Sequence, residues 1–552
     1  KDSVYTYSFF EKLLDFSKMR WYYVQYALYY LIFEQKKRYK PVSSKEVIIL
    51  KHLTKRLDWL TTLVPFLCIL FLCILFIAFP EDSSSVLGSI RFFLGDQFGS
   101  FYLLMGLGAL FCSLYAAFSR FGSIRLGGKS PRYSNLQWGS MMFTAGLAAD
   151  ILFYSLCEWM LYAGEPHISD MGSVQDWASV YPLFHWGPIP WSFYIILAVA
   201  FGFMLHVRKR NRQKYSEACR PVLGKRVDGA LGRIIDLTAV FALLAGTATT
   251  FSLATPLLSM ALSRVTGIPE TPAFTIAILI AICIVYTIAV YFGMKGVARL
   301  ASSCVGLFFV LLAYFFFGGG EMRYIVETGL TSLGNLSQNF IPLATWTDAL
   351  RTSSFPQNWT IFYWAYWMVW CVATPFFIGS ISQGRTIRQT VLGGYFFGLS
   401  GTFTSFIILG NYGLSLQMHG RLDLMAIYVQ SQNLYEAIMA VFETMPFAKA
   451  GLLLLAFTMI AFYATSFDAL TMVASSYSYH SLDEKQEPDR FIKLFWAVTL
   501  MLLPIALIFS ENSMNNLQTV SIIAAFPISF IILLIIWSFF KDAGSYLNET
   551  KK

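Results

Sequence analysis

A run of twelve residues dense in aromatic side chains carries the strongest chemical signal in the sequence. It extends from Trp359 to Trp370 and reads WTIFYWAYWMVW. Positions Tyr363, Tyr366, Trp367 and Trp370 follow an i, i+3, i+4, i+7 spacing, so a helix places them on one face. Several rings on one face can surround a quaternary ammonium by cation–π attraction, which requires no hydrogen bond from the methyl groups. The spacing is equally typical of core packing or of an aromatic belt at a membrane interface.

A second aromatic segment, HWGPIPWSFY, begins at His185. Trp191 and Tyr194 are three residues apart and share a helical face. His185 has no neighbouring partner that would indicate nucleophilic catalysis, and the chain has no GxSxG, HExxH or P-loop in a suitable context. The sequence therefore predicts that the protein is not an enzyme.

Asp150 is a carboxylate inside an apolar run, directly after the small residues of AGLAA. We expect this segment, Ala145 to Asp150, to interrupt its helix. A carboxylate beside a binding site favours a purely cationic ligand and repels a ligand that has its own carboxylate. The alternative is that Asp150 is protonated, or paired with a buried base, and never meets the ligand.

The elements that must position these residues are membrane spans. The chain has 552 residues, 56% hydrophobic and 13% charged, whereas soluble domains carry about 25% charged residues. Runs of about 20 apolar residues can cross a bilayer. Twelve such runs occur: Leu60–Phe79, Gly99–Phe118, Trp138–Tyr162, Pro190–Val207, Ile234–Leu262, Ala273–Gly293, Val297–Phe317, Trp359–Ser380, Thr390–Leu414, Ala448–Ala474, Phe491–Phe509 and Val520–Phe540.

The distribution of Lys and Arg supports this alternation. Basic residues gather in 36–56, 120–132, 208–233, 385–388 and 485–493, all on one side if twelve spans alternate. The positive-inside rule then places both termini inside. The net charge of +9 is explained by topology and contact with anionic lipid, and no nucleic-acid partner is expected.

Three regions follow from this pattern: an N-terminal cytoplasmic or interfacial extension (1–57), a membrane domain (58–541) and a short C-terminal tail (542–552). The extension contains Trp21–Phe33, which is too short to span and is expected to lie in the interface or dock on a protein partner. We expect an amphipathic helix within Gly318–Pro356 on the outer surface. The eight cysteines form no metal-type pair or disulfide set, so neither a zinc site nor a disulfide framework is indicated.

Three motifs together resemble the betaine/choline/carnitine transporter (BCCT) family. They are WTIFYWAYWMVW with the following ISQGRTIR (Ile381–Arg388), FHWGPIPW (Phe184–Trp191), and the pattern Phe153-Tyr154…Glu158. The resemblance covers about residues 58–540. It implies an all-α polytopic membrane protein of twelve transmembrane helices, in which spans 3–7 and 8–12 form a LeuT-like 5+5 inverted repeat. It also implies a secondary transporter, and the family often forms homotrimers.

The resemblance assigns an aromatic cage to the substrate, formed by Trp186, Trp191, Tyr194, Tyr366, Trp367 and Trp370. Choline carriers of the family often have Asp where this chain has Asp150, so choline is expected over glycine betaine or carnitine. The family's sodium-site segment matches Phe462, Thr465 and Ser466, together with the backbone near Leu147. Arg299 lies one residue from the position of a sodium-mimicking arginine. Either it occupies the ion site or it extends to the inner surface.

Departures from the family pattern leave alternatives open. Tyr366 stands where a Trp is usual, and Ser380 and Gln383 replace two arginines, so that only Arg385 remains. The coupling ion is sodium or a proton. The chain could instead be a sodium-independent betaine/carnitine exchanger, or a transporter-derived structural subunit of a larger complex. A plasma or bacterial inner membrane is expected, and the basic extension leaves an organellar inner membrane open.

Overall fold

The computed structural model describes residues 56–146, 148–292, 295–480, 482, 487–509 and 514–550. Side chains are described in these ranges except at 286–302, 465, 509 and 514–517. The chain divides into two compact units, Lys1–Leu57 and Asp58–Lys552. All elements discussed below belong to the second unit. The segment Trp21–Phe33 lies outside the described residues.

Throughout the described part of the second unit the elements are helices, with one isolated β-bridge between Arg125 and Thr386. Labels with η denote short 3₁₀ or π segments. The first elements are α4 (Trp59–Ala78), α5 (Pro80–Phe92), η2 (Phe93–Gln97), α6 (Gly99–Phe118), η3 (Arg120–Ser123), α7 (Asn135–Ala145), α8 (Ala149–Ala163), α9 (Pro166–Met171), α10 (Val174–His185), α11 (Pro188–Gly202) and η4 (Phe203–Val207).

The middle of the chain forms α12 (Tyr215–Ala218), α13 (Arg220–Leu223), η5 (Gly224–Asp228), α14 (Ala230–Thr266), α15 (Pro272–Phe292), α16 (Lys295–Gly318) and α17 (Met322–Thr345). The remainder forms η6 (Pro356–Thr360), α18 (Ile361–Trp370), α19 (Thr374–Ile381), α20 (Ile387–Ser405), η7 (Phe406–Gly410), α21 (Asn411–Met418), α22 (Leu424–Ser431), α23 (Leu434–Glu443), α24 (Ala448–Tyr477), α25 (Arg490–Phe509) and α26 (Met514–Glu549). The helix expected within 318–356 is α17. The last helix continues beyond residue 541 to Glu549.

Eight of the described helices are long and apolar enough to cross a membrane, and the number rises to eleven if each of three bent pairs is one span. The molecule is therefore an all-α polytopic membrane protein. Every one of the twelve expected runs falls on a helix. The sixth run corresponds to α15, whose side chains are described only to residue 285, and the count of twelve stays a prediction.

The expected interruption of the third run is confirmed. Helices α7 and α8 meet at an angle of 63° across residues 146–148. A second break separates α18 from α19, which are bent by 58° across residues 371–373. The sequence pattern predicts one uninterrupted run over 359–380, so this second break is a finding of the structure. Breaks of this kind leave backbone groups without intrahelical partners in the middle of a span, where they can contact a ligand.

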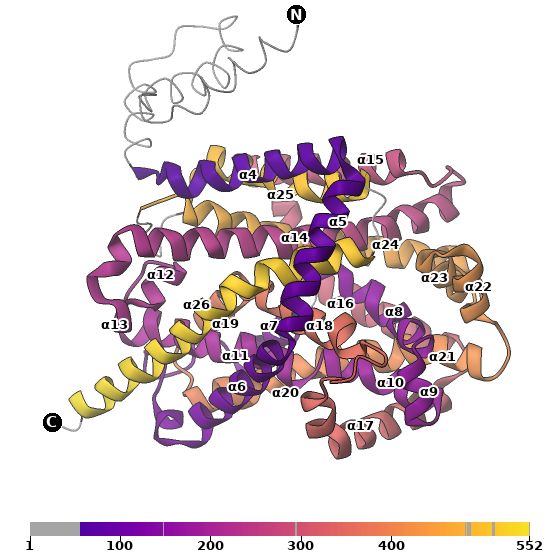
Figure 1. Ribbon diagram of the computed structural model, residues 1–552, viewed down its shortest axis with the longest axis horizontal. Coiled ribbons are helices and arrows are strands. Elements are labelled where there is room, and N and C mark those ends of the chain that lie inside the picture. Colours follow the sequence, from indigo (N-terminus) through magenta and orange to yellow (C-terminus); the bar gives the residue numbers. More distant parts are fainter. Residues whose placement is uncertain are drawn as a thin grey trace, which may run out of the picture. The chain divides into compact units, whose positions relative to one another are not determined.

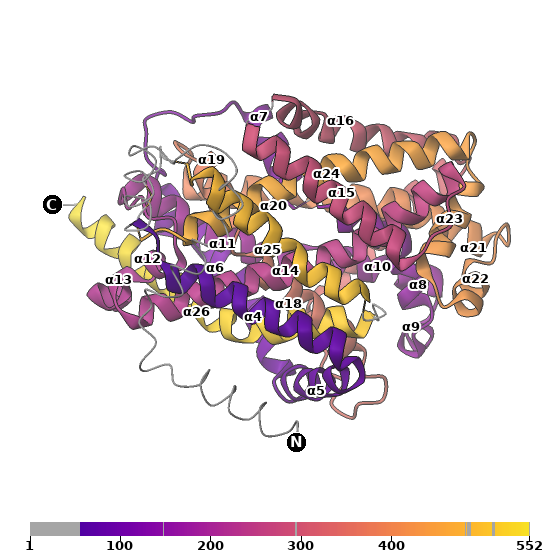
Figure 2. The same ribbon diagram turned by 90° about the horizontal axis from the view of Figure 1, so that it is seen from above.

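Helix α14 is the central packing element of the second unit. It packs against α24, α25, α26, α18 and α8, whereas α11 packs against α19, α6 and α20 (Figures 1 and 2). Small buried residues such as Ala242, Gly246 and Ala248 line α14 and let neighbouring helices approach closely, as is usual in membranes. The helix ends at Thr266 and is capped by Gly267, whose φ of +80° suits a glycine at this position.

Candidate substrate site

A cavity of about 490 Å³ lies between the two helix breaks. Residues from the α7–α8 break, α11, α16, the α18–α19 break and α24 form its wall. Five of the six predicted cage residues line it: Trp186, Tyr194, Tyr366, Trp367 and Trp370. The wall therefore combines residues from distant parts of the sequence, and it brings aromatic rings of several helices to one cavity.

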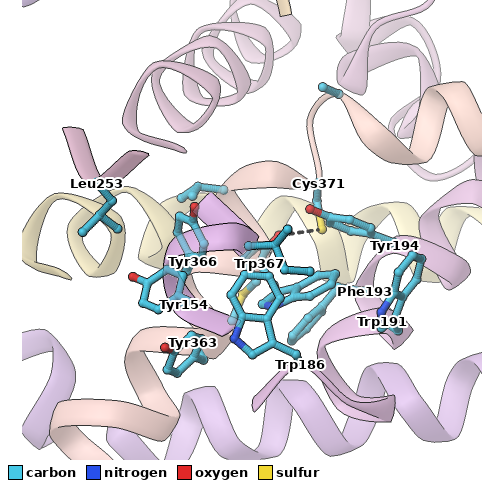
Figure 3. Packing of buried hydrophobic residues seen from close by; sticks show 14 of the residues in the cluster. Tyr154, Trp186, Trp191, Phe193, Tyr194, Leu253, Tyr363, Tyr366, Trp367 and Cys371 are labelled. Carbon is cyan, nitrogen blue, oxygen red and sulfur yellow. Dashed lines mark hydrogen bonds between the residues drawn. The ribbon is translucent and has the colours of Figure 1, made fainter. Parts of the chain in front are cut away.

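Trp367 is the centre of the aromatic wall (Figure 3). Its ring centroid lies 4.7 Å from that of Tyr194, 5.6 Å from Trp191 and 5.7 Å from Trp186. Trp367 and Trp186 are each 3% exposed. A ligand in the cavity thus meets rings that are already desolvated and held by other rings, which is the arrangement in which cation–π attraction is strongest.

Trp191, the sixth predicted cage residue, lies behind this wall. Its side chain is fully buried and is absent from the residues that line the cavity. A Cβ added at Gly146 would lie 2.4 Å from Trp191 Cζ2, and one added at Gly398 would lie 2.6 Å from Trp191 Cζ3. The indole is therefore wedged between the α7–α8 break and α20. In this position it supports the ring of Trp367 and does not touch the cavity.

Asp150 lies in the cavity wall and in the first turn of α8, and its side chain is 3% exposed. The Tyr366 hydroxyl donates a hydrogen bond to Asp150 Oδ2, and Thr250 Oγ1 lies 3.4 Å from the same oxygen. Among the described side chains, no Lys or Arg forms an ion pair with Asp150, so the buried base considered from the sequence is not found there. The amino end of α8 favours a negative charge at this position.

The cavity opens at one end. Phe377 of α19 lines it and is 45% exposed, whereas Trp186 is 3% exposed. Asp468 of α24 also lines the cavity and is exposed. The other end is covered by rings packed on Trp186, with Phe406 at 5.3 Å and Tyr363 at 6.0 Å between centroids. The open end is the one from which α19 leads to Arg385, within a segment rich in basic residues.

The predicted coupling-ion residues are placed in part. Phe462 and Ser466 line the same cavity as Gly146 and Ala148. Leu147 and the side chains of Thr465 and Arg299 lie outside the described residues. Within the described residues, no three His, Cys, Asp or Glu side chains form a group that could hold a metal ion. Hard-oxygen ligation by hydroxyls and backbone carbonyls stays a prediction.

Several cavity residues were missed by the sequence analysis, among them Thr144, Cys304 and Asp468. Asp468 had a detectable signal, because it is a carboxylate in an apolar run two residues after Ser466. Arg385, the arginine retained after span eight, donates to Asn135 Oδ1 at 2.8 Å and lies 4.2 Å from the Trp138 ring centroid. It thus joins the segment after α19 to the start of α7.

Comparison with known proteins identifies the family. Residues 60–547 match the model of the betaine/carnitine/choline family transporters. A carnitine transporter of Acinetobacter baumannii is 29% identical over 437 residues, covering 78% of this chain and 79% of the relative. A high-affinity choline transport protein of Escherichia coli is 28% identical over 481 residues (86% and 70%). A probable glycine betaine transporter of Desulfitobacterium hafniense is 30% identical over 476 residues (84% and 93%). The chain therefore belongs to the betaine/carnitine/choline transporter family and is an integral membrane transporter, not an enzyme.

Proposed function

We propose that this chain is a secondary active transporter that moves choline in preference to glycine betaine or carnitine. The observation that carries the proposal is a buried carboxylate, Asp150, in the same cavity wall as five of the six predicted cage residues. Its hydrogen-bond partners are the hydroxyls of Tyr366 and Thr250. No ion pair to Lys or Arg within the described residues cancels its charge.

The chemistry of the substrate explains why this arrangement favours choline. A quaternary ammonium has no N–H to donate, so its recognition depends on π faces and on a nearby negative charge. Glycine betaine and carnitine carry a carboxylate that Asp150 would repel. Two unit charges about 4 Å apart interact by about 4 kcal/mol at an effective dielectric constant of about 20. Even half of that energy corresponds to a preference of about 30-fold for choline over a substrate that carries a carboxylate.

The transport cycle follows from the broken helices. In this proposal α7–α8 and α18–α19 are spans three and eight, the matching first helices of two inverted five-helix repeats in a twelve-span protein. Alternating access then consists of rocking around a fixed central site. The open end of the cavity faces the cytoplasm because the basic loops lie there. Both termini are cytoplasmic, and the membrane is a plasma or bacterial inner membrane.

Coupling by sodium symport is the simplest mode for the residues that line the cavity. Ser466, with the predicted Thr465 hydroxyl and backbone carbonyls near Leu147, would supply hard oxygen ligands between α8 and α24. A proton is the alternative coupling ion. Gradient-independent exchange of betaine or carnitine is the alternative mode, and the experiment below separates these.

The test is uptake into proteoliposomes of choline, glycine betaine and carnitine, with and without a sodium or proton gradient. Sodium-driven choline uptake by the wild type supports the proposal. Asp150→Gly is expected to reduce choline uptake by about 30-fold in kcat/KM and to leave betaine uptake equal or higher. Unchanged choline kinetics in this variant would remove Asp150 from the explanation. If no substrate moves or binds under any gradient, a structural role in a larger complex becomes the better explanation.

A further inference from the structure

A second polar group lies on the covered side of the aromatic wall, where the proposed transport function assigns nothing. It joins Glu158 and Tyr162 of α8 to His185 at the end of α10. The Tyr162 hydroxyl lies 2.5 Å from Glu158 Oε1 and 2.6 Å from His185 Nδ1. His185 Nε2 lies 3.0 Å from Thr360 Oγ1. These four side chains form one continuous hydrogen-bonded chain, called here the Glu158 relay.

The relay is buried without a permanent counter-charge. The Glu158 and His185 side chains are both 0% exposed, and His185 Nδ1 is 4.0 Å from Glu158 Oε1. Within the described part of the chain, no Lys or Arg forms an ion pair with Glu158. An ionised carboxylate in the membrane interior is costly unless a proton or a cation is close. Glu158 is therefore stable in its ionised form only while a cation lies nearby, and otherwise it takes up a proton.

The other titratable side chains around the relay cannot supply a positive charge beside Glu158. They are Asp150, Tyr154 and Cys157 on α8, Tyr181 on α10, Tyr363 on α18, Tyr435 on α23 and Tyr463 on α24. All of them are neutral or anionic when they titrate. His185 is the histidine bonded directly to Tyr162. His167 of α9 can also become cationic, but its Nε2 lies 3.0 Å from the Tyr181 hydroxyl, and it reaches the relay only through that side chain.

The heavy-atom geometry fits two states that differ by one proton. In the first, Tyr162 donates to Glu158 Oε1, His185 Nδ1–H donates to Tyr162, and His185 Nε2 accepts from Thr360. When a proton arrives at Nε2, the Nδ1 proton passes to the Tyr162 oxygen, and the Tyr162 proton passes to Glu158 Oε1. Glu158 is then a neutral acid, His185 is again neutral, and Nε2–H donates to Thr360. No heavy atom has to move in this exchange.

One member of the aromatic wall is bonded directly to the relay. Trp186 Nε1 donates to Glu158 Oε2 at 2.8 Å, and Trp186 lines the cavity. An ionised Glu158 makes this indole a better partner for a cation, because it places negative charge behind the ring. A protonated Glu158 withdraws that charge while the indole hydrogen bond persists.

We infer that Glu158, Tyr162 and His185 form a proton-binding site that competes, through Trp186, with a cationic substrate in the cavity. The inference rests on the proposed function in that the substrate is a cation. Linkage requires that the two ligands weaken each other by the same factor, typically about 5- to 150-fold. Choline binding releases a proton from the relay, and acidification weakens choline binding.

The first test needs no substrate. Infrared difference spectra of the full-length protein in lipid nanodiscs are recorded between neutral and acidic pH, and the protonated-carboxyl C=O band is followed. Glu158→Gln is expected to remove one component of this band, and Tyr162→Phe is expected to shift that component because it breaks the link to His185. A band unchanged in Glu158→Gln overturns the inference. Tyr162→Phe keeps the test decisive if Glu158→Gln does not fold, because an unshifted band in that variant also overturns it.

Glu165→Gln is the matched control. Glu165 Oε1 accepts a hydrogen bond from Trp359 Nε1 at 2.7 Å. This variant therefore changes a second carboxylate–indole pair of the same kind, one that has no bridging tyrosine and imidazole. It is expected to retain the component that Glu158→Gln loses. Asp150→Asn identifies the contribution to the band of the buried carboxyl in the cavity wall.

The second test adds choline. Wild-type protein in weakly buffered solution is expected to release protons on binding, and its choline Kd is expected to rise about 5- to 150-fold from neutral to acidic pH. Glu158→Gln should bind choline with less pH dependence and less proton release. Equal proton release by wild type and Glu158→Gln would overturn the linkage. Failure of the wild type to bind choline at any pH would instead overturn the proposed function, and the infrared result would still decide whether the proton site exists.

Discussion

Trp367→Leu tests whether the aromatic wall recognises charge. The residue is the hub of the wall and is 3% exposed, so its π face acts in a desolvated setting. Cation–π attraction there contributes about 2 kcal/mol, which equals a factor of about 30 in Kd. Among the described residues the Trp367 indole N–H has no hydrogen-bond partner. Leucine therefore removes the π face without leaving a broken polar contact.

The assay compares choline with its neutral isostere, 3,3-dimethyl-1-butanol. The two ligands have the same shape, so both lose the packing contribution when the indole is removed, and only choline loses the cation–π contribution. We expect the Kd of the neutral ligand divided by the Kd of choline to fall by about 30-fold in Trp367→Leu. Binding is measured by calorimetry on protein in nanodiscs, with the neutral ligand titrated at high concentration.

Trp364→Leu is the control for this prediction. Trp364 lies in the same helix, is fully buried, and likewise has an indole N–H without a partner in the described residues. Its ring packs against Phe184 and His185, and it is not among the residues that line the cavity. We expect comparable destabilisation but an unchanged Kd ratio. If Trp367→Leu weakens both ligands equally, the cavity recognises shape, and the cation–π argument is refuted.

Three further predictions concern stability. Tyr366→Phe and Asp150→Gly should show a coupling energy of about 1–2 kcal/mol in a double-mutant cycle of thermal melts, because the Tyr366 hydroxyl donates to the Asp150 carboxylate. A coupling energy of zero would contradict this hydrogen bond. Gly398→Ala should lower the melting temperature by overpacking Trp191, at a cost of about 1–3 kcal/mol, and Trp191→Leu in addition should restore part of it. In the loop before η6, burial raises the pKa of Asp348, but hydrogen bonds from the N–H groups of residues 352–354 outweigh burial and hold this pKa well below the ordinary value. The ionised Asp348 therefore adds to the free energy of unfolding above pH about 4, and this contribution is lost as pH falls through the lowered pKa. Asp348→Asn should accordingly lower the melting temperature at pH 7 but not at the acid end of a pH series.

The positions of the helices were predictable because a membrane span is a local signal. Each expected run is predicted from the hydropathy of its own residues alone. The break at Ala145–Asp150 is predicted from small residues followed directly by a carboxylate. The role of Trp191 was not predictable in the same way. Its distance from the cavity depends on Gly146 in the α7–α8 break and on Gly398 in α20, which close on the indole from either side.

The Glu158 relay was missed for the same physical reason. Glu158 and Tyr162 are four residues apart on one helix, but His185 and Thr360 come from α10 and η6. Nothing near His185 in the sequence indicates a carboxylate partner, and Glu158 entered the sequence analysis only as part of a motif. Tertiary packing alone creates the chain of hydrogen bonds.

Asp150 and Tyr366 are best understood together, as one hydrogen-bonded unit. An aspartate at the α7–α8 break introduces a carboxylate that is 3% exposed, and such a group is unfavourable unless it is hydrogen-bonded. The tyrosine hydroxyl supplies that hydrogen bond while the ring stays in the cavity wall. Glu158 has the same relation to Trp186. Helix α8 thus holds two carboxylates, each bonded to one aromatic residue of the wall. When ionised, both place negative charge near a quaternary ammonium, which has no N–H to donate and is therefore attracted by charge and by π faces alone.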